Sequence, residues 1–159
     1  MKALYDNFLF EKPELKKLKN EVNQTTFFKL LTSSELSIVT KYLQLRHFKK
    51  GERIFFEGDN GSALFVVLRG NVQISKISTH KKTIFAELGQ GNFFGELALV
   101  HDVPRTASAA ATEDTLLVCL FRHDFESIVK SYPMLGNKMQ GIINKILAQR
   151  LSAVIEKTL

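Results

Sequence analysis

The stretch FFGELALVHDVPRTASAAA (residues 93–111) places an acid, Glu96, nine positions before a base, Arg105, among small and apolar residues. A glycine, Gly95, precedes the acid, and a proline, Pro104, precedes the base. Gly95 permits backbone geometry or a close approach that a side chain would forbid. Pro104 fixes its own φ and favours an extended conformation at the residue before it, so Arg105 is presented from a stiffened loop. With a glycine and a proline at these positions, the stretch is not expected to form a regular strand.

The same residues have the chemistry of a sugar phosphate site. The segment ELALV (residues 96–100) can form one helical turn, and exposed N–H groups at its start favour an anion. The planar, permanently charged guanidinium of Arg105 suits a phosphate. The carboxylate of Glu96 only accepts hydrogen bonds, so it suits hydroxyl groups. The alternative is an exposed ion pair in a surface loop, which contributes only about 0–1 kcal/mol and does not explain the surrounding pattern.

Short apolar or alternating runs flank this stretch from about Arg46 to about Phe121. These runs are RIFFE, ALFVVLR, VQISKIS, KTIFAEL, TASAAA and TLLVCLF. Glycines lie between them at roughly the 8–12 residue spacing of an antiparallel sandwich or barrel. The runs therefore predict a small antiparallel β-structure in the middle of the chain.

Helical patterns precede and follow the strands. The first fifty residues are predicted to be helical in PELKKLKNEV, TTFFKLL and SSELSIVTKYLQL, with Thr32 and Glu35 spaced as a capping box. After Phe121 the helical period returns in HDFESIVKSYP and in MLGNKMQGIINKILAQRLSAVIEKTL. We therefore predict an α+β fold, an antiparallel β-roll or jelly-roll barrel flanked by N-terminal and C-terminal helices. An apolar stripe on the last helix is formed by Ile142, Ile143, Ile146, Leu147, Leu151 and Val154.

Length and composition limit the alternatives. A chain of 159 residues with 45% hydrophobic and 24% charged residues is typical of one globular domain. No apolar run is long enough to span a bilayer, and the N-terminus lacks the small-residue cleavage site of a secretory signal, so we expect a cytoplasmic protein without a membrane segment. The net charge of +6 divides into +5, −2 and +3 over residues 1–50, 51–130 and 131–159, which disfavours a nucleic-acid surface on the strand region.

Cysteine and histidine usage gives no sign of metal or redox chemistry. Cys119 is the only cysteine and lies in the apolar run TLLVCLF, so we expect a buried small hydrophobe. The four histidines, at positions 47, 80, 101 and 123, lack short ligand spacing, and we expect no metal site.

The segment FGELALVHDVPRTA (residues 94–107, here called the cassette) closely resembles the phosphate-binding cassette of the cyclic nucleotide-binding domain family. KKGERIFFEGD and LFVVLRGNVQI look like that family's glycine-marked turns and barrel strands, and the resemblance spans roughly residues 27–151. It implies a binding domain over residues 27–159, with a C-terminal lid helix from about residue 134. A helical extension over residues 1–26 would precede the domain.

The resemblance also implies roles for individual residues. Glu96 would accept a hydrogen bond from the ribose 2′-hydroxyl, Arg105 would pair with the cyclic phosphate, and nearby backbone would complete the cradle. The base would lie against apolar barrel residues, capped by the C-terminal helix. The implied ligand-binding residues are Phe94, Gly95, Glu96, Leu97, Ala98, Pro104, Arg105, Thr106 and Ala107, and the candidate base caps are Ile146, Arg150 and Leu151.

The cassette departs from the commoner family pattern at its tip. His101, Asp102 and Val103 stand where aromatic or small residues are frequent. In the family, a threonine at the position of Thr106 can help to hold guanine, but it also occurs in members that prefer cAMP. The choice between the two bases stays open.

We predict a non-catalytic receptor that binds cAMP, or alternatively cGMP, and repositions its C-terminal helix, with no cofactor besides this ligand. A second hypothesis is a degenerate cassette in a protein interaction module. The output would be an effector protein, self-association through the C-terminal helix, or buffering of the ligand.

Two further hypotheses are a transcription factor and an enzyme. LAQRLSAV (residues 147–154) looks like the pairing helix of catabolite-activator transcription factors, but the 26 residues after Pro133 are used by one helix, so we expect no direct DNA binding. An enzyme is disfavoured because Glu96 is the one well-placed acid or base and no nucleophile accompanies it.

Overall fold

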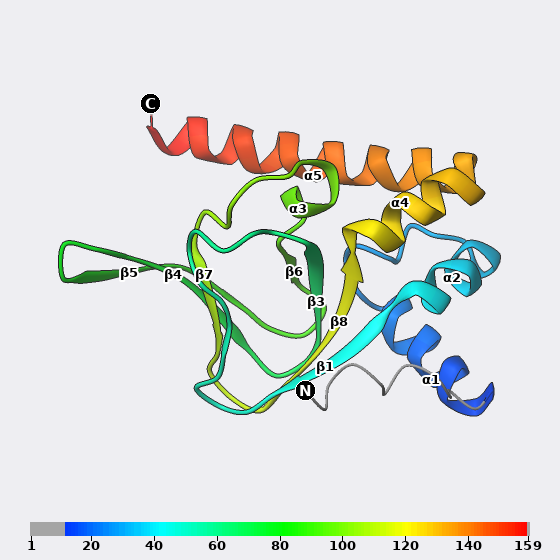
Figure 1. Cartoon of the computed structure of the whole chain (residues 1–159), viewed down its shortest axis with the longest axis horizontal. Helices are drawn as coiled ribbons and strands as arrows, with labels where there is room; N and C mark the ends of the chain where they lie inside the picture. The colour runs from blue at the N-terminus through cyan, green and yellow to red at the C-terminus, as the bar shows by residue number, and fades with distance from the viewer. Residues whose placement is uncertain (1–11, 159) are drawn as a thin grey trace. The chain divides into compact units, whose positions relative to one another are not determined.

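The computed structural model describes residues 12–158, and the chain separates into two compact units, one ending at Arg122 and the other beginning at His123. Figure 1 traces the elements in chain order. The N-terminal segment that we judged unlike a secretory signal begins in residues 1–11, and these lie outside the described residues together with the start of the predicted extension. None of the helices within residues 12–158 has the length and apolar content that a membrane span requires.

The first unit opens with helical elements, α1 (Lys12–Asn23), α2 (Ser33–Val39) and the 3₁₀ turn η1 (Thr40–Tyr42). The predicted capping box is present: the Glu35 N–H donates to Thr32 Oγ1 at 3.3 Å, and the Thr32 N–H donates to Glu35 Oε2 at 2.7 Å. TTFFKLL, predicted as helix, forms turns instead. Phe27 and Phe28 are both fully buried there. In a surface helix, consecutive side chains point in different directions, so burying both favours turns over a helix.

The predicted antiparallel β-roll is confirmed. Two four-stranded sheets face each other, ordered β1-β8-β3-β6 and β2-β7-β4-β5. The strands are β1 (Gln44–Phe48), β2 (Arg53–Phe55), β3 (Ala63–Arg69), β4 (Val72–Ser78), β5 (Lys81–Leu88), β6 (Phe93–Phe94), β7 (Ser108–Ala111) and β8 (Thr115–Phe121). All pairings within the sheets are antiparallel.

The core lies between the two sheets. Side chains from both contribute to one buried cluster, which includes Val67, Val72, Phe94, Leu117 and Cys119. Phe94 stacks on Phe65, with ring centroids 5.2 Å apart and an interplanar angle of 15°. This aromatic packing fixes Phe94, the last residue of β6 and the first of the cassette, so the cassette starts from a fixed point.

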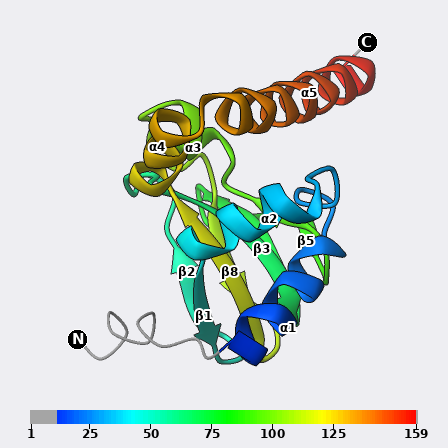
Figure 2. The ribbon, with the colours of Figure 1, turned by 90° about the vertical axis from the view of Figure 1, so that its right-hand side faces the viewer.

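Helices α1 and α2 lie on the outer face of the sheet that contains β1, β8 and β3 (Figure 2). Along β8, Leu117 and Cys119 enter the core between the sheets, while Val118 and Leu120 alternate to the other face and are equally buried. The sheet is therefore apolar on both faces, which explains why TLLVCLF reads as a continuous apolar run.

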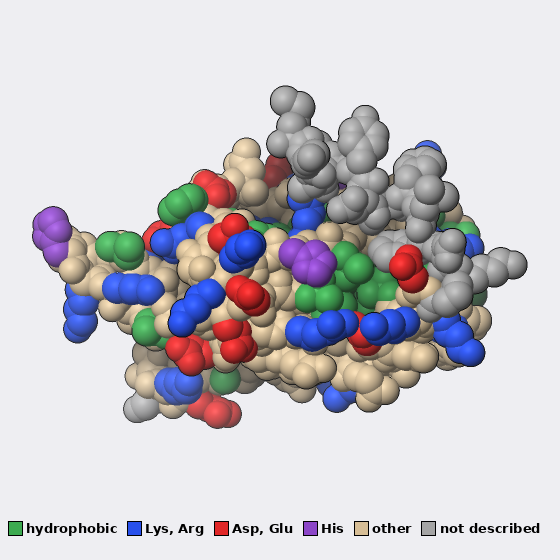
Figure 3. All heavy atoms as spheres, turned by 90° about the horizontal axis from the view of Figure 1, so that it is seen from below, with side chains coloured by type: hydrophobic (Ala, Val, Ile, Leu, Met, Phe, Trp, Pro, Cys, Tyr) green, Lys and Arg blue, Asp and Glu red, His purple; other side chains and the backbone are tan. Residues whose placement is uncertain are grey.

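The hairpin of β4 and β5 projects from the barrel (Figures 1 and 3). β4 pairs with β7 only over residues 72–75, so the outer half of the hairpin has no third strand. More than half of the side chains of Ile77, Ile84 and Phe85 is exposed there. The two-residue turn uses Thr79 and His80, both with positive φ, at 42° and 70°.

The second unit consists of the rest of α4 (Arg122–Ser131) together with α5 (Pro133–Thr158). A Cβ on Gly136 would lie 2.6 Å from Val129 Cα, so this glycine allows α4 and α5 to approach closely. The predicted apolar stripe on α5 divides into a buried part, with Ile142 and Ile143, and an exposed part, with Leu151 and Val154. The division at residues 122–123 does not test the predicted limits 1–26 and 27–159, which stay predictions.

Candidate ligand-binding site

A sharp turn in the cassette follows β6. Gly95 has φ of +78°, a conformation that residues with a Cβ rarely adopt. The Ala98 N–H donates to Gly95 O at 3.2 Å and the Leu99 N–H donates to Glu96 O at 3.1 Å, which starts the short helix α3 (Leu97–Val100). The predicted single helical turn in ELALV is therefore confirmed.

Gly95 also leaves room for the arginine of the cassette. A Cβ at this position would lie 2.6 Å from Arg105 Nη1 and 2.9 Å from Ala63 O. Either contact is too short for a real Cβ. Glycine is therefore required at position 95 both by its own backbone conformation and by the nearby side chain of Arg105. This close approach explains the glycine before Glu96.

The guanidinium of Arg105 is held on several sides. Nη2 donates to Ala63 O at 2.9 Å, and Nη1 donates to Gly95 O at 3.4 Å. Cζ lies 4.2 Å from the ring centroid of Phe55 and 5.5 Å from that of Phe65. The Nε atom is buried and has no hydrogen-bond partner among the described residues.

Burial affects the charge of this group. Arg105 is 9% exposed and Glu96 only 4%, so the two do not form the exposed surface pair considered above. Burial lowers the pKa of Arg105 from its ordinary value, and the nearby negative charge of Glu96 opposes that change. Buried charges are costly unless other groups stabilise them, so this pair has a role that a surface loop would not need.

A glycine loop (residues 58–62) holds the backbone on either side of Arg105. The Arg105 N–H donates to Asp59 O at 2.7 Å, and the Gly58 N–H donates to Arg105 O at 2.8 Å. Pro104 forms an isolated antiparallel bridge with Asn60. The side chain of Arg105 therefore projects from a backbone segment whose N–H and C=O are both hydrogen-bonded. This agrees with the stiffened loop that Pro104 predicted.

The structure brings Gly95, Glu96 and Arg105 together but distributes the other predicted residues more widely. The side chain of Phe94 belongs to the barrel core, while Thr106 is exposed. The remaining cassette residues lie around these groups: Leu97 and Ala98 are in α3, Pro104 precedes Arg105, and Ala107 follows Thr106. The candidate base caps Ile146, Arg150 and Leu151 lie on α5 in the second unit, and their role stays a prediction.

Sequence reasoning missed one charged residue of the site, Arg122. It follows β8 directly, and its Nε donates to Ala98 O at 2.8 Å. Its Nη2 donates to Gly61 O, and its Nη1 lies 2.9 Å from Asp102 Oδ1. A single cation after the apolar run TLLVCLF was the available signal.

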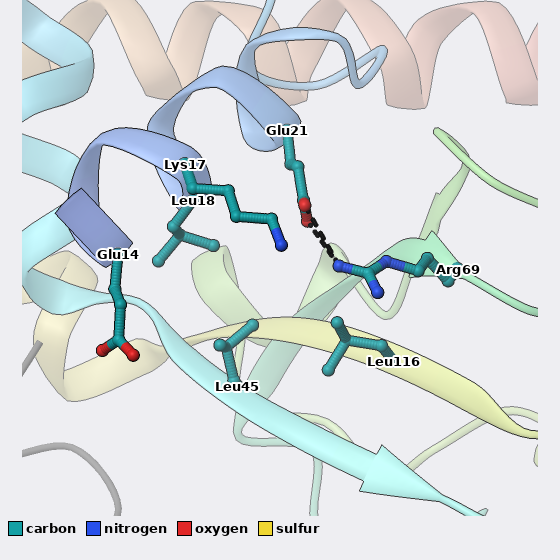
Figure 4. Close-up of a pocket in the computed structure, with 7 residues that line it drawn as sticks. All are labelled: Glu14, Lys17, Leu18, Glu21, Leu45, Arg69 and Leu116. Atoms are coloured by element: carbon teal, nitrogen blue, oxygen red, sulfur yellow. Dashed lines mark hydrogen bonds and ion pairs between the residues drawn. The ribbon is translucent and has the colours of Figure 1, made fainter.

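A pocket of about 200 Å³ lies elsewhere in the first unit, between α1 and the sheet (Figure 4). Leu18, Leu45 and Leu116 give it an apolar lining, and Arg69 pairs with Glu21 at 3.0 Å at its edge. No residue of the cassette lines it. It is therefore separate from the candidate site.

The groups weighed for metal and redox chemistry have ordinary environments. All four histidines are exposed, and within residues 12–158 no cluster of three or more His, Cys, Asp or Glu side chains is placed to hold a metal ion. Cys119 is fully buried in the core, as predicted, and burial raises the pKa of its thiol to about 12.

Comparisons with known proteins agree with this geometry. The family model of the cyclic nucleotide-binding domain matches residues 45–132. The curated Cyclic AMP receptor protein of Thermus thermophilus is 34% identical over 122 residues, which are 75% of this chain and 56% of that protein. The chain thus spans just over half the length of this relative.

Solved structures give the same result. The crystal structure of Thermus thermophilus Catabolite Activator Protein superposes with a TM-score of 0.74 at 32% identity, over 83% of this chain and 61% of that one. The regulatory domain of Toxoplasma gondii PKA, solved with cAMP, gives a TM-score of 0.67 at 28% identity, over 77% and 47%. The match of the family model over more than half of the chain, on a β-roll that carries the cassette, shows that the chain belongs to the cyclic nucleotide-binding domain family.

Proposed function

We propose that this domain is a non-catalytic receptor for a cyclic nucleotide, with cAMP preferred. The observation that carries the proposal is the state of Arg105, a buried guanidinium whose Nε has no partner among the described residues. A buried donor without an acceptor is costly, and an anionic phosphate oxygen supplies a strong acceptor. A cytoplasmic location is part of the proposal and rests on the sequence alone.

The neighbouring groups fit the rest of such a ligand. In the proposed complex, the Glu96 carboxylate accepts a hydrogen bond from the ribose 2′-hydroxyl, next to the phosphate held by Arg105. The preference for cAMP is supported by the relative named as a Cyclic AMP receptor protein and by the regulatory domain solved with cAMP. cGMP is the alternative ligand, since the exposed Thr106 offers a hydroxyl that a guanine can use.

Isothermal titration of the purified chain with cAMP and with cGMP tests the proposal. We expect heat from at least one of them, with tighter binding of cAMP. Absence of heat from both at ligand concentrations of about 1 mM, where even a weak site of millimolar Kd is detected, would contradict it. That outcome would favour a protein interaction module with a degenerate cassette.

Replacement of the phosphate-binding arginine gives a sharper test. Arg105→Ala should weaken binding by about 2–5 kcal/mol, the range for removing one partner of a buried charge pair. Arg53→Ala is the matched control, because Arg53 also lies over a ring, 4.9 Å from Phe56, but is exposed. Circular dichroism melting checks that both variants fold. Equal affinities of the two variants would place the phosphate elsewhere.

The proposal includes a change in the C-terminal helix. Binding can shift this helix only if the ligand contacts one arrangement better than another. Spin labels at two exposed positions, Lys50 in the first unit and Gln149 on α5, report the distance between the units with and without cAMP. A new distance distribution on binding is expected, and identical distributions would remove this part of the proposal.

Self-association through α5 is the proposed route of output. Leu151, Val154 and Ile155 are each about half exposed or more, and an apolar surface of this kind on a helix favours pairing. Light scattering should show a dimer that Leu151→Glu dissociates, while Met134→Glu, at an exposed position near the start of the helix, leaves it intact. A monomer with and without ligand excludes this route and leaves an effector protein or buffering of the ligand as the output.

A further inference from the structure

Arg122 lies outside the cassette but contacts it at two residues, Ala98 and Asp102. Its Nε donates to Ala98 O at 2.8 Å, its Nη2 donates to Gly61 O, and its Nη1 lies 2.9 Å from Asp102 Oδ1. The acceptors belong to the helix α3, to the glycine loop and to the tip of the cassette. One planar guanidinium therefore joins the cassette, at both α3 and the tip that directly follows it, to the glycine loop, which lies well before it in the sequence.

The helix α3 needs such support. It has four residues, too few to satisfy its own carbonyl groups, and so short a helix is not stable by itself. The hydrogen bond from Arg122 satisfies the carbonyl of Ala98, a residue that is almost fully buried. Loss of this donor would leave a polar group without a partner in a largely buried environment.

The backbone of Arg122 is fixed on the same side of the site. Its N–H donates to Ser62 O at 2.8 Å, next to the Gly61 carbonyl that its side chain contacts. Gly61 in turn donates from its N–H to Val103 O at 3.4 Å. The glycine loop and the tip of the cassette are thus connected both directly and through Arg122.

Arg122 also acts on the charge of the site. Its positive charge is close enough to Arg105 to lower the pKa of that group, in the same direction as burial. An anion bound at Arg105 would be attracted by both guanidinium groups. Removal of Arg122 therefore changes both the position of α3 and the potential at the phosphate.

We propose that Arg122 is a positioning residue for the ligand site, which holds α3 and the tip of the cassette against the glycine loop and so sets the affinity for a cyclic nucleotide. The affinity part of this inference rests on the proposed function. The positioning part concerns the ligand-free chain and is tested without a ligand.

Hydrogen exchange of the ligand-free chain tests the positioning. In Arg122→Met, the amides of residues 98–103 should exchange at least about 10-fold faster than in the parent chain, as expected when a buried carbonyl loses its donor. Arg69→Met is the matched control, because Arg69 also makes an ion pair in the first unit, with Glu21 at 3.0 Å, but does not contact the cassette. Unchanged exchange in these residues, in a variant that remains folded by circular dichroism, overturns the proposal.

Titration with cAMP tests the affinity. Arg122→Met should weaken binding by about 10-fold to 100-fold, and Arg122→Lys should recover only part of this loss because an ammonium group cannot reach all three acceptors. Asp102→Asn should have the smallest effect, since Asp102 is 82% exposed and the other two bonds remain. Full recovery by lysine would show that charge alone matters and would overturn the positioning role.

The two proposals fail in different ways. If the parent chain binds neither cAMP nor cGMP but Arg122→Met accelerates exchange in residues 98–103, the positioning stands and the proposed ligand falls. If the parent chain binds cAMP and Arg122→Met changes neither affinity nor exchange, the ligand stands and the role of Arg122 falls.

Discussion

The cassette and the hairpin of β4 and β5 belong to the same barrel but differ in the burial of their charged and apolar side chains. In the cassette, Arg105 is buried and its guanidinium is directed by Ala63 O, Gly95 O and two aromatic rings. In the outer hairpin, lysines and large apolar side chains are exposed together, the two backbones pair only with each other, and Lys76 Nζ lies 2.7 Å from Glu57 Oε1. Several contacts therefore fix the Arg105 side chain of the cassette, whereas a single strand pair forms the outer hairpin.

This difference indicates where the fold tolerates change. Residues 76–86 contain three lysines and no acid, and an exposed edge strand with lysines and a bulge resists pairing with other chains. The cassette has no comparable freedom, because the Arg105 guanidinium donates to Ala63 O and Gly95 O, and the Ala98 carbonyl accepts from Arg122. Substitutions should therefore have large effects in the cassette and small ones in the hairpin.

Among substitutions that leave Arg105 in place, the largest effect is expected from Gly95→Ala. The new Cβ would clash with Arg105 Nη1 and Ala63 O at a φ of +78°, so we expect a loss of about 2 kcal/mol or more of binding free energy for cAMP. Gly91→Ala is the control, because its φ is +86° but nothing lies within 4 Å of the new Cβ. Calorimetry should show unchanged affinity for the control. Equal losses in both would mean that backbone strain, and not the clash with Arg105, is responsible.

Glu96→Gln should have a smaller effect that depends on the sugar. Loss of a charged acceptor should weaken cAMP binding by about 1.5–3 kcal/mol. Binding of 2′-deoxy-cAMP, which lacks the hydroxyl, should be the same in the variant and in the parent chain. Competition titrations with the two nucleotides measure the difference. An equal loss for both would assign Glu96 to the support of Arg105 instead of to the ribose.

Replacement of the hairpin turn should stabilise the fold by a modest amount. Thr79 and His80 both have positive φ, which asparagine and glycine adopt at lower cost in a two-residue turn. Thr79→Asn with His80→Gly should raise the free energy of unfolding by about 1 kcal/mol, as urea denaturation would show. Affinity for cAMP should not change. Destabilisation would indicate that these side chains make contacts that the turn alone does not explain.

The smallest effect is expected on the exposed face of the hairpin. Phe85→Thr keeps a residue that favours strands and removes an exposed ring, so the stability should change by no more than about 0.5 kcal/mol. Thermal melting checks this. A loss of stability above about 1 kcal/mol is expected only when a packed group is removed. Such a loss would show that the Phe85 ring is covered in solution and that the hairpin tolerates substitution no better than the cassette.

The sequence predicted the barrel and the cassette better than their connections. Glycines between short apolar runs indicated the strands, and Gly95 with Pro104 indicated the fixed loop, because these residues act through their own backbone. The turns over residues 25–31 were predicted wrongly as helix, since burial of Phe27 and Phe28 overrode the helical pattern. The cation after TLLVCLF indicated a charged residue at position 122 but not its role, because two of its acceptors are backbone carbonyls, which carry no signal in the sequence.

The burial of Cys119 has a practical consequence for the chemistry of the chain. Alkylating agents and peroxide react with the thiolate, and a thiol with a pKa of about 12 has almost none of this form near neutral pH. Because this is the only cysteine, the native sequence should stay inert to such reagents while it is folded. A cysteine introduced on the surface would then be the single reactive group, which allows fluorescent or spin labels to be attached without first removing a native thiol.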